Sequence, residues 1–570
     1  MSLVRAFNQV REDGPVTSQL PVAMDTPQLR KARGAFFTPD AVAQYVTDWA
    51  VRSASDRVLE PSCGEAAFLL QAGRRLEELA PGSTSTNDRL CGAELHRASA
   101  RTASRLLRAA GHSSDIRQGD FFLHEPTPVF DAVIGNPPYV RYQDFSGASR
   151  SASRRAALRA GVTLTNLASS WAAFTVHSAL FLKPGGRLGL VLPAELLSVN
   201  YAAPVREYLM RSFARVRLVL FTERVFPGVL EEVVLLLADG KDNGPTDHCE
   251  LIQARNGASL QAVTEDQVTR WTPRGRQRWS ELHLDGQTAA TYRSAMSPST
   301  FAPLQEWGDT TLGMVTGANK YFAITAAEAL RRRIPEVDLI RLSPPGSRHL
   351  RALSLTRPQL DALDAAGKST WLFRPAGDPS SASRLYIRDG ETLGVQKAYK
   401  CRVRTPWWRV PYLKPADLLL TYMNADTARL CTNVVGAHHL NSVHGVYLRP
   451  SFKKVGKSLL PLASLNSVSL LGAEVVGRAY GGGILKLEPK EADIWPMPVP
   501  TLVMAAGQDL QHARREVRDL LARSQLLAAV DIIDKILLKH SPRMNGAALE
   551  QMRQARQSLH DRRTGRGQSY

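Results

Sequence analysis

Val58-Leu59-Glu60-Pro61-Ser62-Cys63-Gly64-Glu65-Ala66 joins a short apolar run to an amphipathic segment, and this stretch indicates the fold of the first half of the chain. Arg57–Leu59 predicts a strand and Ala66–Leu79 predicts a helix. The small residues between them let the backbone approach a ligand, and the N-terminus of the helix favours an anionic or polar group. The loop lacks the G-x-G-x-x-G pattern, which disfavours a nicotinamide dinucleotide as that ligand.

Short apolar runs and helical patterns alternate from about Arg57 to Gly240. Further strands are predicted at Leu90–Glu94, Asp115–Arg117, Phe130–Ile134, Arg187–Leu192, Val216–Phe221 and Glu232–Leu237. Further helices are predicted at Arg97–Gly111, Ser169–Leu182 and Pro204–Phe213, with a turn at Lys183-Pro184-Gly185-Gly186. The alternation predicts an α/β fold with a doubly wound, parallel-rich sheet of the Rossmann-like kind.

Polar side chains follow the predicted strands at the edge of the sheet where ligands bind in this fold. Glu94 ends the second strand, where an acid usually accepts hydrogen bonds from ribose hydroxyls, although an exposed strand-end carboxylate is an alternative reading. Asp120 follows the third strand and can accept from an adenine amino group, while Phe121 can lie against the base. These strand ends predict a nucleoside-like cofactor.

Asn136-Pro137-Pro138-Tyr139 follows the buried strand Phe130–Ile134 after one glycine. The two prolines fix φ at successive positions and remove two N–H donors, so the turn is stiff and its carbonyls face outward. An amide and an aromatic ring on such a turn can hold a planar, amino-bearing substrate. Taken alone, the tetrapeptide also fits an ordinary strand-to-loop turn.

The composition points to a folded protein with a polyanionic partner. A chain of 570 residues predicts about two or three domains, and 44% hydrophobic with 22% charged residues is typical of a soluble protein. The net charge of +19 favours nucleic acid as the partner, because Lys and Arg that neutralise phosphates release condensed counterions. A solvated basic surface without a partner is the alternative.

The cysteines and the hydropathy pattern indicate in which cellular compartment the protein is found. The five cysteines are scattered without a CxxC pair, which argues against a zinc site or any other metal centre and against a disulfide framework. No apolar stretch is long enough to span a bilayer, and residues 1–24 lack the apolar core of a signal peptide. We therefore expect a cytoplasmic protein with no membrane association.

The polar stretch Lys241–Thr246 is the expected boundary of the first domain, because the alternation is lost beyond it. We expect an N-terminal extension at 1–33, a catalytic domain at 34–245 and an irregular α+β domain at 246–504. A helical segment should follow at 505–540, and the Arg-rich tail at 541–570 is expected to be frayed.

The motifs together resemble those of the gamma-class adenine-N6 DNA methyltransferases, which use S-adenosylmethionine. They occur in that family's order between about Gly34 and Gly240. The resemblance implies cofactor-binding roles for Thr38 in the leading motif Gly34–Pro39, for Glu60, Ser62 and Gly64 in the cofactor loop, for Glu94 on the ribose, for Asp120 and Phe121 on the adenine, and for Phe174 as a cofactor-side aromatic. It implies catalytic roles for Asn136, Pro137, Pro138 and Tyr139, and for Phe226 as a second aromatic clamp on the target base. Core packing is the alternative for Phe174 and for Phe226.

This resemblance implies methyl transfer from S-adenosylmethionine to the N6 amino group of an adenine flipped out of double-stranded DNA. It implies that the Asn136 oxygen and the Pro137 carbonyl accept the two N–H groups, between Tyr139 and Phe226 on the faces of the base. It also implies a separately encoded restriction endonuclease, against which methylation protects the host DNA. Three later segments look like parts of a target-recognition region in the larger members: Thr311–Lys320, His439–His444 and Tyr480–Gly483.

Other functions remain open from the residues alone. An Asn-Pro-Pro-Tyr turn suits a glutamine side chain of a protein, or structural RNA, as the methyl acceptor, and the protein could also bind DNA without catalysis. The long basic region behind the motifs favours DNA. A fused nuclease is disfavoured, because no convincing Pro-Asp…Asp/Glu-x-Lys arrangement is found.

Overall fold

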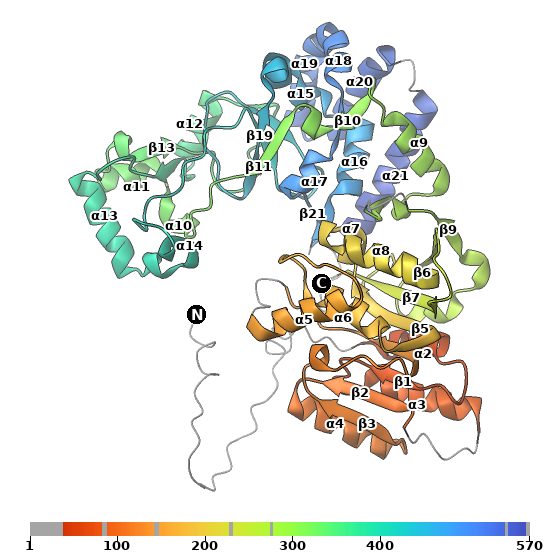
Figure 1. Cartoon of the computed structure of the whole chain (residues 1–570). Helices are drawn as coiled ribbons and strands as arrows, with labels where there is room; N and C mark the ends of the chain where they lie inside the picture. The colour runs from red at the N-terminus through yellow and green to blue at the C-terminus, as the bar shows by residue number, and fades with distance from the viewer. Residues whose placement is uncertain are drawn as a thin grey trace.

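The computed structural model describes residues 38–81, 88–141, 147–226, 232–273, 278–480, 482–541 and 545–565. The N-terminal half is built on one nine-stranded sheet, and the C-terminal half carries four smaller sheets and a layer of helices (Figure 1). Much of the leading motif, Gly34–Phe37, lies outside the described residues, as do Pro227 and Gly481.

The nine-stranded sheet has the order β3-β2-β1-β4-β5-β7-β6-β8-β9. Strands β1 to β5 are parallel to their neighbours within this group, whereas β7 runs antiparallel between β5 and β6. The strands are β1 Val58–Glu60, β2 Leu90–Glu94, β3 Ser114–Gln118, β4 Phe130–Gly135, β5 Leu182–Pro193, β6 Phe213–Phe221, β7 Val233–Lys241, β8 Cys249–Ala254 and β9 Thr269–Trp271. The predicted α/β fold class is confirmed.

Helices cover both faces of this sheet. Alternate residues of the central strands point to opposite faces, so Val58 and Leu59 enter two different apolar clusters. One cluster includes α2, α3 and α4, and the other includes α5, α6, α7 and α8. These helices are α2 Asp40–Ala50, α3 Ala67–Leu79, α4 Arg97–Ala109, α5 Gly147–Arg159, α6 Ser170–Ala179, α7 Glu195–Ser198 and α8 Ala203–Ser212. Burial on both sides explains why the central strands are almost wholly apolar.

The sheet order changes direction at β1 and β4. The chain proceeds outward from β1 through β2 to β3, then returns to place β4 and β5 on the other side of β1. Ligands of open α/β sheets bind beside the carboxyl ends of the strands at such a switch point. The loop after Glu60 and the tetrapeptide starting at Asn136 both leave the sheet there.

The structure corrects several boundaries expected from the sequence. Strands β8 and β9 lie beyond Lys241–Thr246 and still belong to the first sheet, because β8 pairs with β6 and β9 with β8. The helix expected at Ser169–Leu182 ends at Ala179, and Lys183–Gly186 forms an irregular part of β5 where the register with β4 shifts. Helix α5 was not predicted, since its apolar positions are alanines rather than large side chains.

The C-terminal half holds a five-stranded sheet of order β11-β19-β16-β18-β14, the pair β10-β22, and two three-stranded sheets, β12-β15-β13 and β17-β21-β20. The strands are β10 Phe301–Pro303, β11 Gly308–Leu312, β12 Ala323–Ile324, β13 Leu339–Arg341, β14 Ser354–Leu355, β15 Trp371–Phe373, β16 Leu418–Thr421, β17 Met423–Asn424, β18 Leu430–Asn433, β19 Val443–Leu448, β20 Arg478–Tyr480, β21 Ile484–Lys486 and β22 Pro496–Pro498. The irregular α+β character expected for this region is what short strands in several sheets produce.

Two groups of helices accompany these sheets. A side lobe, made of α10, α11, α13, α14 and the sheet β12-β15-β13, has its own apolar cluster and lies on the left of Figure 1. Of the other helices, α9 and α15 to α21 share a second cluster with the five-stranded sheet, and α12 contributes Leu363 to a smaller cluster. The helices are α9 Gly286–Ala295, α10 Asn319–Phe322, α11 Ala326–Arg331, α12 Arg357–Ala365, α13 Ser381–Thr392, α14 Tyr399–Arg402, α15 Lys453–Ala463, α16 Ser467–Val476, α17 Pro489–Asp493, α18 Pro500–Ala505, α19 Gly507–Ala522, α20 Leu526–Lys539 and α21 Gly546–Gly565.

The end of the chain differs from its prediction. The expectation of a frayed tail is wrong, because Gly546–Gly565 forms a 20-residue helix, α21. It buries Leu549 and Met552 in the core of the C-terminal half, and its Arg553 pairs with the buried Asp534 of α20 at 2.7 Å. Two of the arginines that made the segment look unstructured, Arg553 and Arg563, are partners in ion pairs with buried carboxylates.

Within the described residues, no single helix is both long and apolar enough to cross a membrane. One pair of helices, Pro450–Ala463 with Ser467–Val476, passes that test only when joined, and it is bent by 88°. All five cysteines are buried and unpaired.

The buried ion pair between Arg187 and Asp56 is expected to stabilise the first sheet, and substitution of Asp56 tests this. Their side chains are 10% and 7% exposed and 2.9 Å apart, and Asp56 also accepts from the backbone N–H groups of Arg52 and Ser53. Asp56→Ala should lower the free energy of unfolding by about 3–5 kcal/mol, because it leaves a buried guanidinium without its partner. Asp115→Ala, which removes the exposed pair with Arg117, should cost less than about 1 kcal/mol. Chemical denaturation of the two variants measures both values, and equal losses would contradict this account.

Candidate active site

Gly135 ends β4 and directs the chain toward the loop after β1. Its φ is +156°, in a region that side chains disfavour, and a Cβ atom there would lie 3.5 Å from Glu60 Cγ. The tetrapeptide that begins at Asn136 is thereby placed against the loop Glu60–Pro61. Pro137 is buried, while Asn136, Pro138 and Tyr139 are half-buried.

Hydrogen bonds fix the orientation of the Asn136 amide. Its Nδ2 donates to the Thr38 hydroxyl at 3.2 Å. The Tyr139 hydroxyl lies 2.8 Å from Asn136 Oδ1 and 3.0 Å from the carbonyl oxygen of Val191 on β5, so it can donate to either. The amide oxygen keeps a second lone pair for another donor. The structure thus brings together three residues predicted for the site: Thr38, Asn136 and Tyr139.

Ser170, the first residue of α6, holds the other end of the tetrapeptide. Its hydroxyl donates to the carbonyl of Pro138 and accepts from the N–H of Val140 at 2.9 Å. These two contacts fix the chain on both sides of Tyr139. The sequence analysis missed Ser170, although a serine at the start of a helix behind the tetrapeptide is a usable signal.

Glu60 ends β1 and turns its side chain into the protein. Its side chain is buried and accepts from the backbone N–H of Leu69 at 3.1 Å, near the start of α3. Burial raises the pKa of the Glu60 carboxyl well above its ordinary range. Glu60 therefore holds the start of α3 in position, which the sequence alone did not indicate.

Glu94 links the end of β2 to that loop. One carboxylate oxygen accepts from the N–H of Gly64 at 2.9 Å, and the other accepts from the N–H of His96 at 2.7 Å. Gly64 has a φ of +51°, which suits its place in the tight turn. Ser62, two residues before it, is half-buried. Three of the predicted cofactor residues, Ser62, Gly64 and Glu94, therefore lie around one turn at the strand ends.

Phe121 and Phe174 contact each other instead of presenting free faces. Their rings are stacked at 5.7 Å, and they are only 3% and 7% exposed. His177 on α6 lies 3.1 Å from the carbonyl of Phe121, and burial lowers the pKa of this histidine to about 4. Asp120 accepts from the N–H of Phe122 at 3.0 Å and so begins a short 3₁₀ turn, Phe121–Leu123. The two stacked rings are part of the apolar cluster on that face of the sheet and leave little ring surface exposed.

Two exposed leucines stand beside these groups. Leu95 follows Glu94 and is 70% exposed, and Leu123 ends the 3₁₀ turn and is 63% exposed. Large apolar side chains this exposed at the carboxyl edge of a sheet are typical of a ligand-binding surface. Neither leucine was predicted for the site, although Leu95 adjoins Glu94 and Leu123 lies three residues after Asp120.

Phe226 is buried, at 4% exposure, in the apolar cluster that Tyr139 also contacts. The two aromatic residues predicted to hold the target base therefore share one cluster. Phe226 faces the core of that cluster in this structure, in line with the alternative that the sequence left open for it.

Two of the later motifs meet in the C-terminal half. Met314 donates its N–H to the carbonyl of His439 at 3.0 Å, and Asn319 lies 3.3 Å from the side chain of Asn441. The segments Thr311–Lys320 and His439–His444 thus form one structural unit although they are far apart in the sequence.

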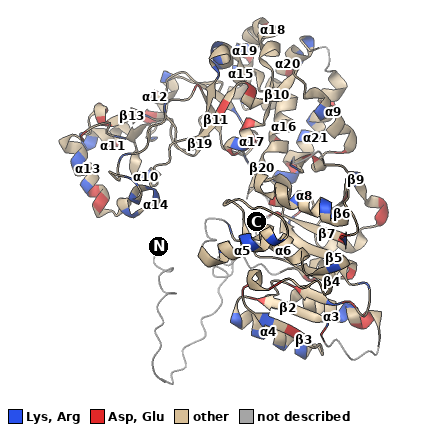
Figure 2. Ribbon diagram, in the orientation of Figure 1, with Lys and Arg blue, Asp and Glu red and all other residues tan. Residues whose placement is uncertain are grey.

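A basic and aromatic surface covers one part of the side lobe. Between Thr392 and Ala416 the sequence has no acidic residue. Five exposed basic residues occur there, and none of them takes part in an ion pair within the described part of the chain: Lys397, Lys400, Arg402, Arg409 and Lys414. Tyr399 and Trp408 lie within 6.0 Å of guanidinium or ammonium groups of this set. Figure 2 shows basic residues on α13 and α14 of the lobe and on α5 of the other half.

Comparison with known proteins assigns both halves of the chain. Residues 22–278 match the family model of the N-6 DNA methylases, and residues 276–538 match the C-terminal domain of the Type II methyltransferase M.Eco57I. The chain belongs to the Type II adenine-N6 DNA methyltransferases. It is therefore a site-specific enzyme of restriction-modification that methylates adenine in DNA, which favours DNA over protein or RNA as the methyl acceptor.

Individual relatives agree with this assignment. The Type II methyltransferase M.AccI of Acinetobacter calcoaceticus is 23% identical over 81% of this chain and 84% of its own length. M.XamI of Xanthomonas campestris pv. amaranthicola is 26% identical over 82% and 85%. The solved structure of the Type IIL restriction-modification enzyme MmeI in complex with DNA has a TM-score of 0.53, with 11% identity over 90% of this chain and 73% of that one, and shows a shared fold.

Because Glu60 is buried, the free energy of unfolding should depend on pH. Because its pKa is raised, the folded state binds more protons than the unfolded state between glutamate's ordinary pKa, about 4.3, and the raised value. The contribution of Glu60 to the free energy of unfolding therefore falls as the pH rises from its ordinary pKa to its raised pKa. Glu60→Gln keeps an oxygen for Leu69 and should gain stability relative to the parent by up to about 1.4 kcal/mol per pH unit there.

Denaturation curves at several pH values measure this difference. Glu65→Gln, at an exposed position of the same loop, serves as the control and should follow the parent protein throughout. A Glu60→Gln curve that also follows the parent would show that Glu60 carries its charge in the folded state.

Proposed function

We propose that Asn136–Tyr139 is the active site at which a methyl group passes from S-adenosylmethionine to the N6 amino group of an adenine in double-stranded DNA. The main support is the Asn136 amide, whose nitrogen is engaged by Thr38 and whose oxygen faces Tyr139. An amide held in this way keeps an oxygen lone pair that can accept from an incoming amino group.

The chemistry required of these residues is orientation. The adenine amino nitrogen is a weak nucleophile because its lone pair is delocalised into the ring. Asn136 Oδ1 and the Pro137 carbonyl accept its two N–H groups and draw the nitrogen toward tetrahedral geometry, with its lone pair aimed at the methyl donor. Because Thr38, Tyr139 and Ser170 already hold the turn, little reorganisation is needed when the base arrives.

The strand ends beside the tetrapeptide fit the methyl donor. S-adenosylmethionine supplies an electrophilic methyl group on a sulfonium. We assign Glu94 to the ribose and Asp120 to the adenine, and the exposed Leu95 and Leu123 offer apolar contact to a base. Ser62 and Gly64 belong to the loop that Glu94 holds by its bond to Gly64. Thr38 bonds to Asn136, and we assign it to the methionine end of the donor, where the methyl group is transferred. Phe121 and Phe174 support this surface from behind.

The target adenine must leave the duplex to reach this site, because a stacked base cannot approach a donor held in the sheet crevice. We assign one face of the flipped base to Tyr139 and the other to Phe226. Stacking on an aromatic ring returns part of the cost of unstacking.

We assign recognition of the DNA sequence to the C-terminal half and backbone contact to the basic surface Lys397–Lys414. Exposed Lys and Arg beside aromatic rings are suited to phosphates and bases. The proposed role is protection of host DNA, in the cytoplasm, against a separately encoded restriction endonuclease.

The tetrapeptide is tested by two substitutions. Asn136→Ala should lower kcat for methylation of duplex DNA by about 100-fold or more, as expected for loss of one preorganised polar group. Tyr139→Phe keeps the ring but loses the hydroxyl contacts, and should lower kcat by about tenfold. Parent-level activity of Asn136→Ala, in a preparation whose far-ultraviolet spectrum matches the parent, would exclude this site.

The methyl acceptor can be identified by expressing the protein in a host whose DNA carries no methylation of its own. Long-read sequencing that detects modified bases should find one adenine-containing motif methylated across the genome by the parent protein and none by Asn136→Ala. Unmodified DNA together with a methylated host protein would contradict the proposal.

The basic surface is tested by salt dependence. The variant with Lys400→Ala, Arg402→Ala and Arg409→Ala should bind duplex DNA with a slope of log K against log salt reduced by about 3, since each phosphate contact contributes about 0.9. A variant with Arg515→Ala, Arg518→Ala and Arg523→Ala loses the same charge from α19 and the residue after it, and should keep the parent slope. Equal slopes for the two variants would place the DNA elsewhere.

A further inference from the structure

Helix α21 connects the two halves of the protein. It lies beyond residue 538, where the matched region of the second family model ends, so family membership gives it no role. Along its length it is attached to the C-terminal half: Met552 is buried in that core, Arg553 pairs with Asp534, and Gln551 bonds to Thr291 of α9 at 2.9 Å. A 20-residue helix held in this way is a rigid rod about 30 Å long.

Arg563, in the last turn of α21, holds a turn of the C-terminal half. It forms a two-point ion pair with Glu474 of α16 at 2.8 and 3.1 Å, and both side chains are 3% exposed. It also donates to the carbonyls of Ala425, Asp426 and Gly483. These contacts use all five N–H groups of the guanidinium, so a lysine could not replace it.

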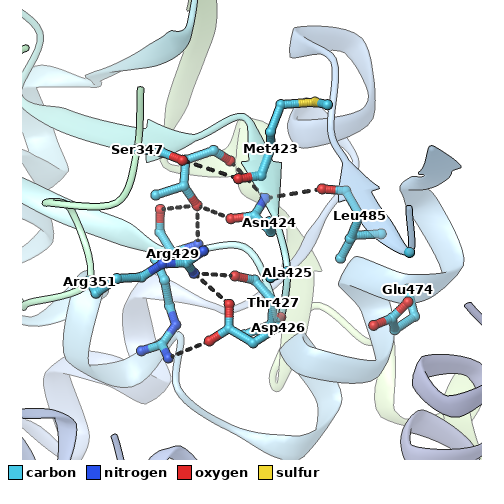
Figure 3. Close-up of polar contacts among 12 residues, drawn as sticks. Ser347, Arg351, Met423, Asn424, Ala425, Asp426, Thr427, Arg429, Glu474 and Leu485 are labelled. Carbon is cyan, nitrogen blue, oxygen red and sulfur yellow. Dashed lines mark hydrogen bonds and ion pairs between the residues drawn. The ribbon is translucent and has the colours of Figure 1, made fainter. Parts of the chain in front are cut away.

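The turn that Arg563 holds is itself a dense polar unit. Figure 3 shows Asp426 between Arg351 and Arg429, at 2.6 and 3.1 Å. The same turn directly follows β17, which pairs with β21, and β21 pairs with β20. Gly483 and Tyr480 belong to the glycine-containing segment that resembles part of a target-recognition region. Arg563 therefore fixes the base of this small sheet.

Arg562, the neighbouring residue, reaches the other half. It donates to the carbonyl of Phe221 at 2.9 Å and lies 3.0 Å from Nδ1 of His283. Phe221 is the last residue of β6, the strand that leads to Phe226. Two consecutive arginines thus contact the sheet that carries the active site and the sheet β17-β21-β20.

We propose that α21 is a strut: Arg562 and Arg563 set the position of the sheet β17-β21-β20 relative to the end of β6, so that sequence recognition and methyl transfer act on DNA in a fixed register. Both arginines are positioning residues. The part that concerns DNA rests on the proposed function, whereas the mechanical part concerns the protein alone.

The mechanical part is measured without DNA. Ala98→Cys on α4 and Ala362→Cys on α12 are exposed sites for spin labels, and the five native cysteines are buried. Electron–electron dipolar spectroscopy should give one narrow distance distribution for the labelled parent. Arg562→Ala, which leaves the buried Arg563–Glu474 pair intact, should broaden it at least twofold, and Arg562→Lys should restore it in part by donating to Phe221. Ser558→Ala, exposed on the same helix, should leave it unchanged.

The functional part is measured as discrimination. The ratio of kcat/KM between the cognate site and a site with one mismatched base pair should fall about tenfold or more in Arg562→Ala, while binding of S-adenosylmethionine by calorimetry stays within about twofold. Parent-like distances and discrimination in Arg562→Ala overturn the strut. Loss of cofactor binding and activity in step with a lower Tm shows a merely structural role and overturns it too. Absence of adenine methylation by the parent protein defeats the proposed function, and broadened distances would support the strut even then.

Discussion

The parallel pairing of β1 with β4 is the constraint on which the rest of the structure depends. Val58 lies opposite Ala132 and Leu59 opposite Val133, and both strands are buried on both faces. A shift of one residue would exchange the side chains that enter the two apolar clusters, so the register is strongly specified. Because the register is fixed, the loop after Glu60 and the tetrapeptide after Gly135 must leave the sheet side by side.

Contacts from three other elements then convert this meeting of loops into a defined site. Thr38 precedes α2, Val191 belongs to β5 and Ser170 begins α6, and each makes a hydrogen bond to the tetrapeptide or its flanking residues. A turn held by these bonds is oriented before any substrate arrives, and in the proposed mechanism this orientation takes the place of a strong base. The buried Glu60 contributes indirectly, by holding α3 and the loop above it.

The surplus of positive charge has two uses that composition cannot separate. Lys400 and Arg402 are exposed and outside any ion pair in the described residues, as expected for contacts with phosphates. Arg429 and Arg563 are buried and bound to Asp426 and Glu474 inside the C-terminal half. Part of the net charge of +19 therefore stabilises the protein itself, and only the remainder is a measure of the DNA-binding surface.

Residues close together in the sequence determined the α/β alternation, the order of the motifs and the polar residues at the strand ends, because periodicity and turn chemistry act over a few residues. They predicted the segments of β1 to β4 to within a residue or two, and they are the basis for proposing Asn136, Tyr139 and Glu94 as site residues. Only the tertiary structure decided that Phe121 stacks on Phe174, that β8 and β9 extend the first sheet, and that the arginine-rich end is a helix. The bond from Arg562 to Phe221 spans 341 residues, and no local pattern encodes a contact that exists only after both halves have folded.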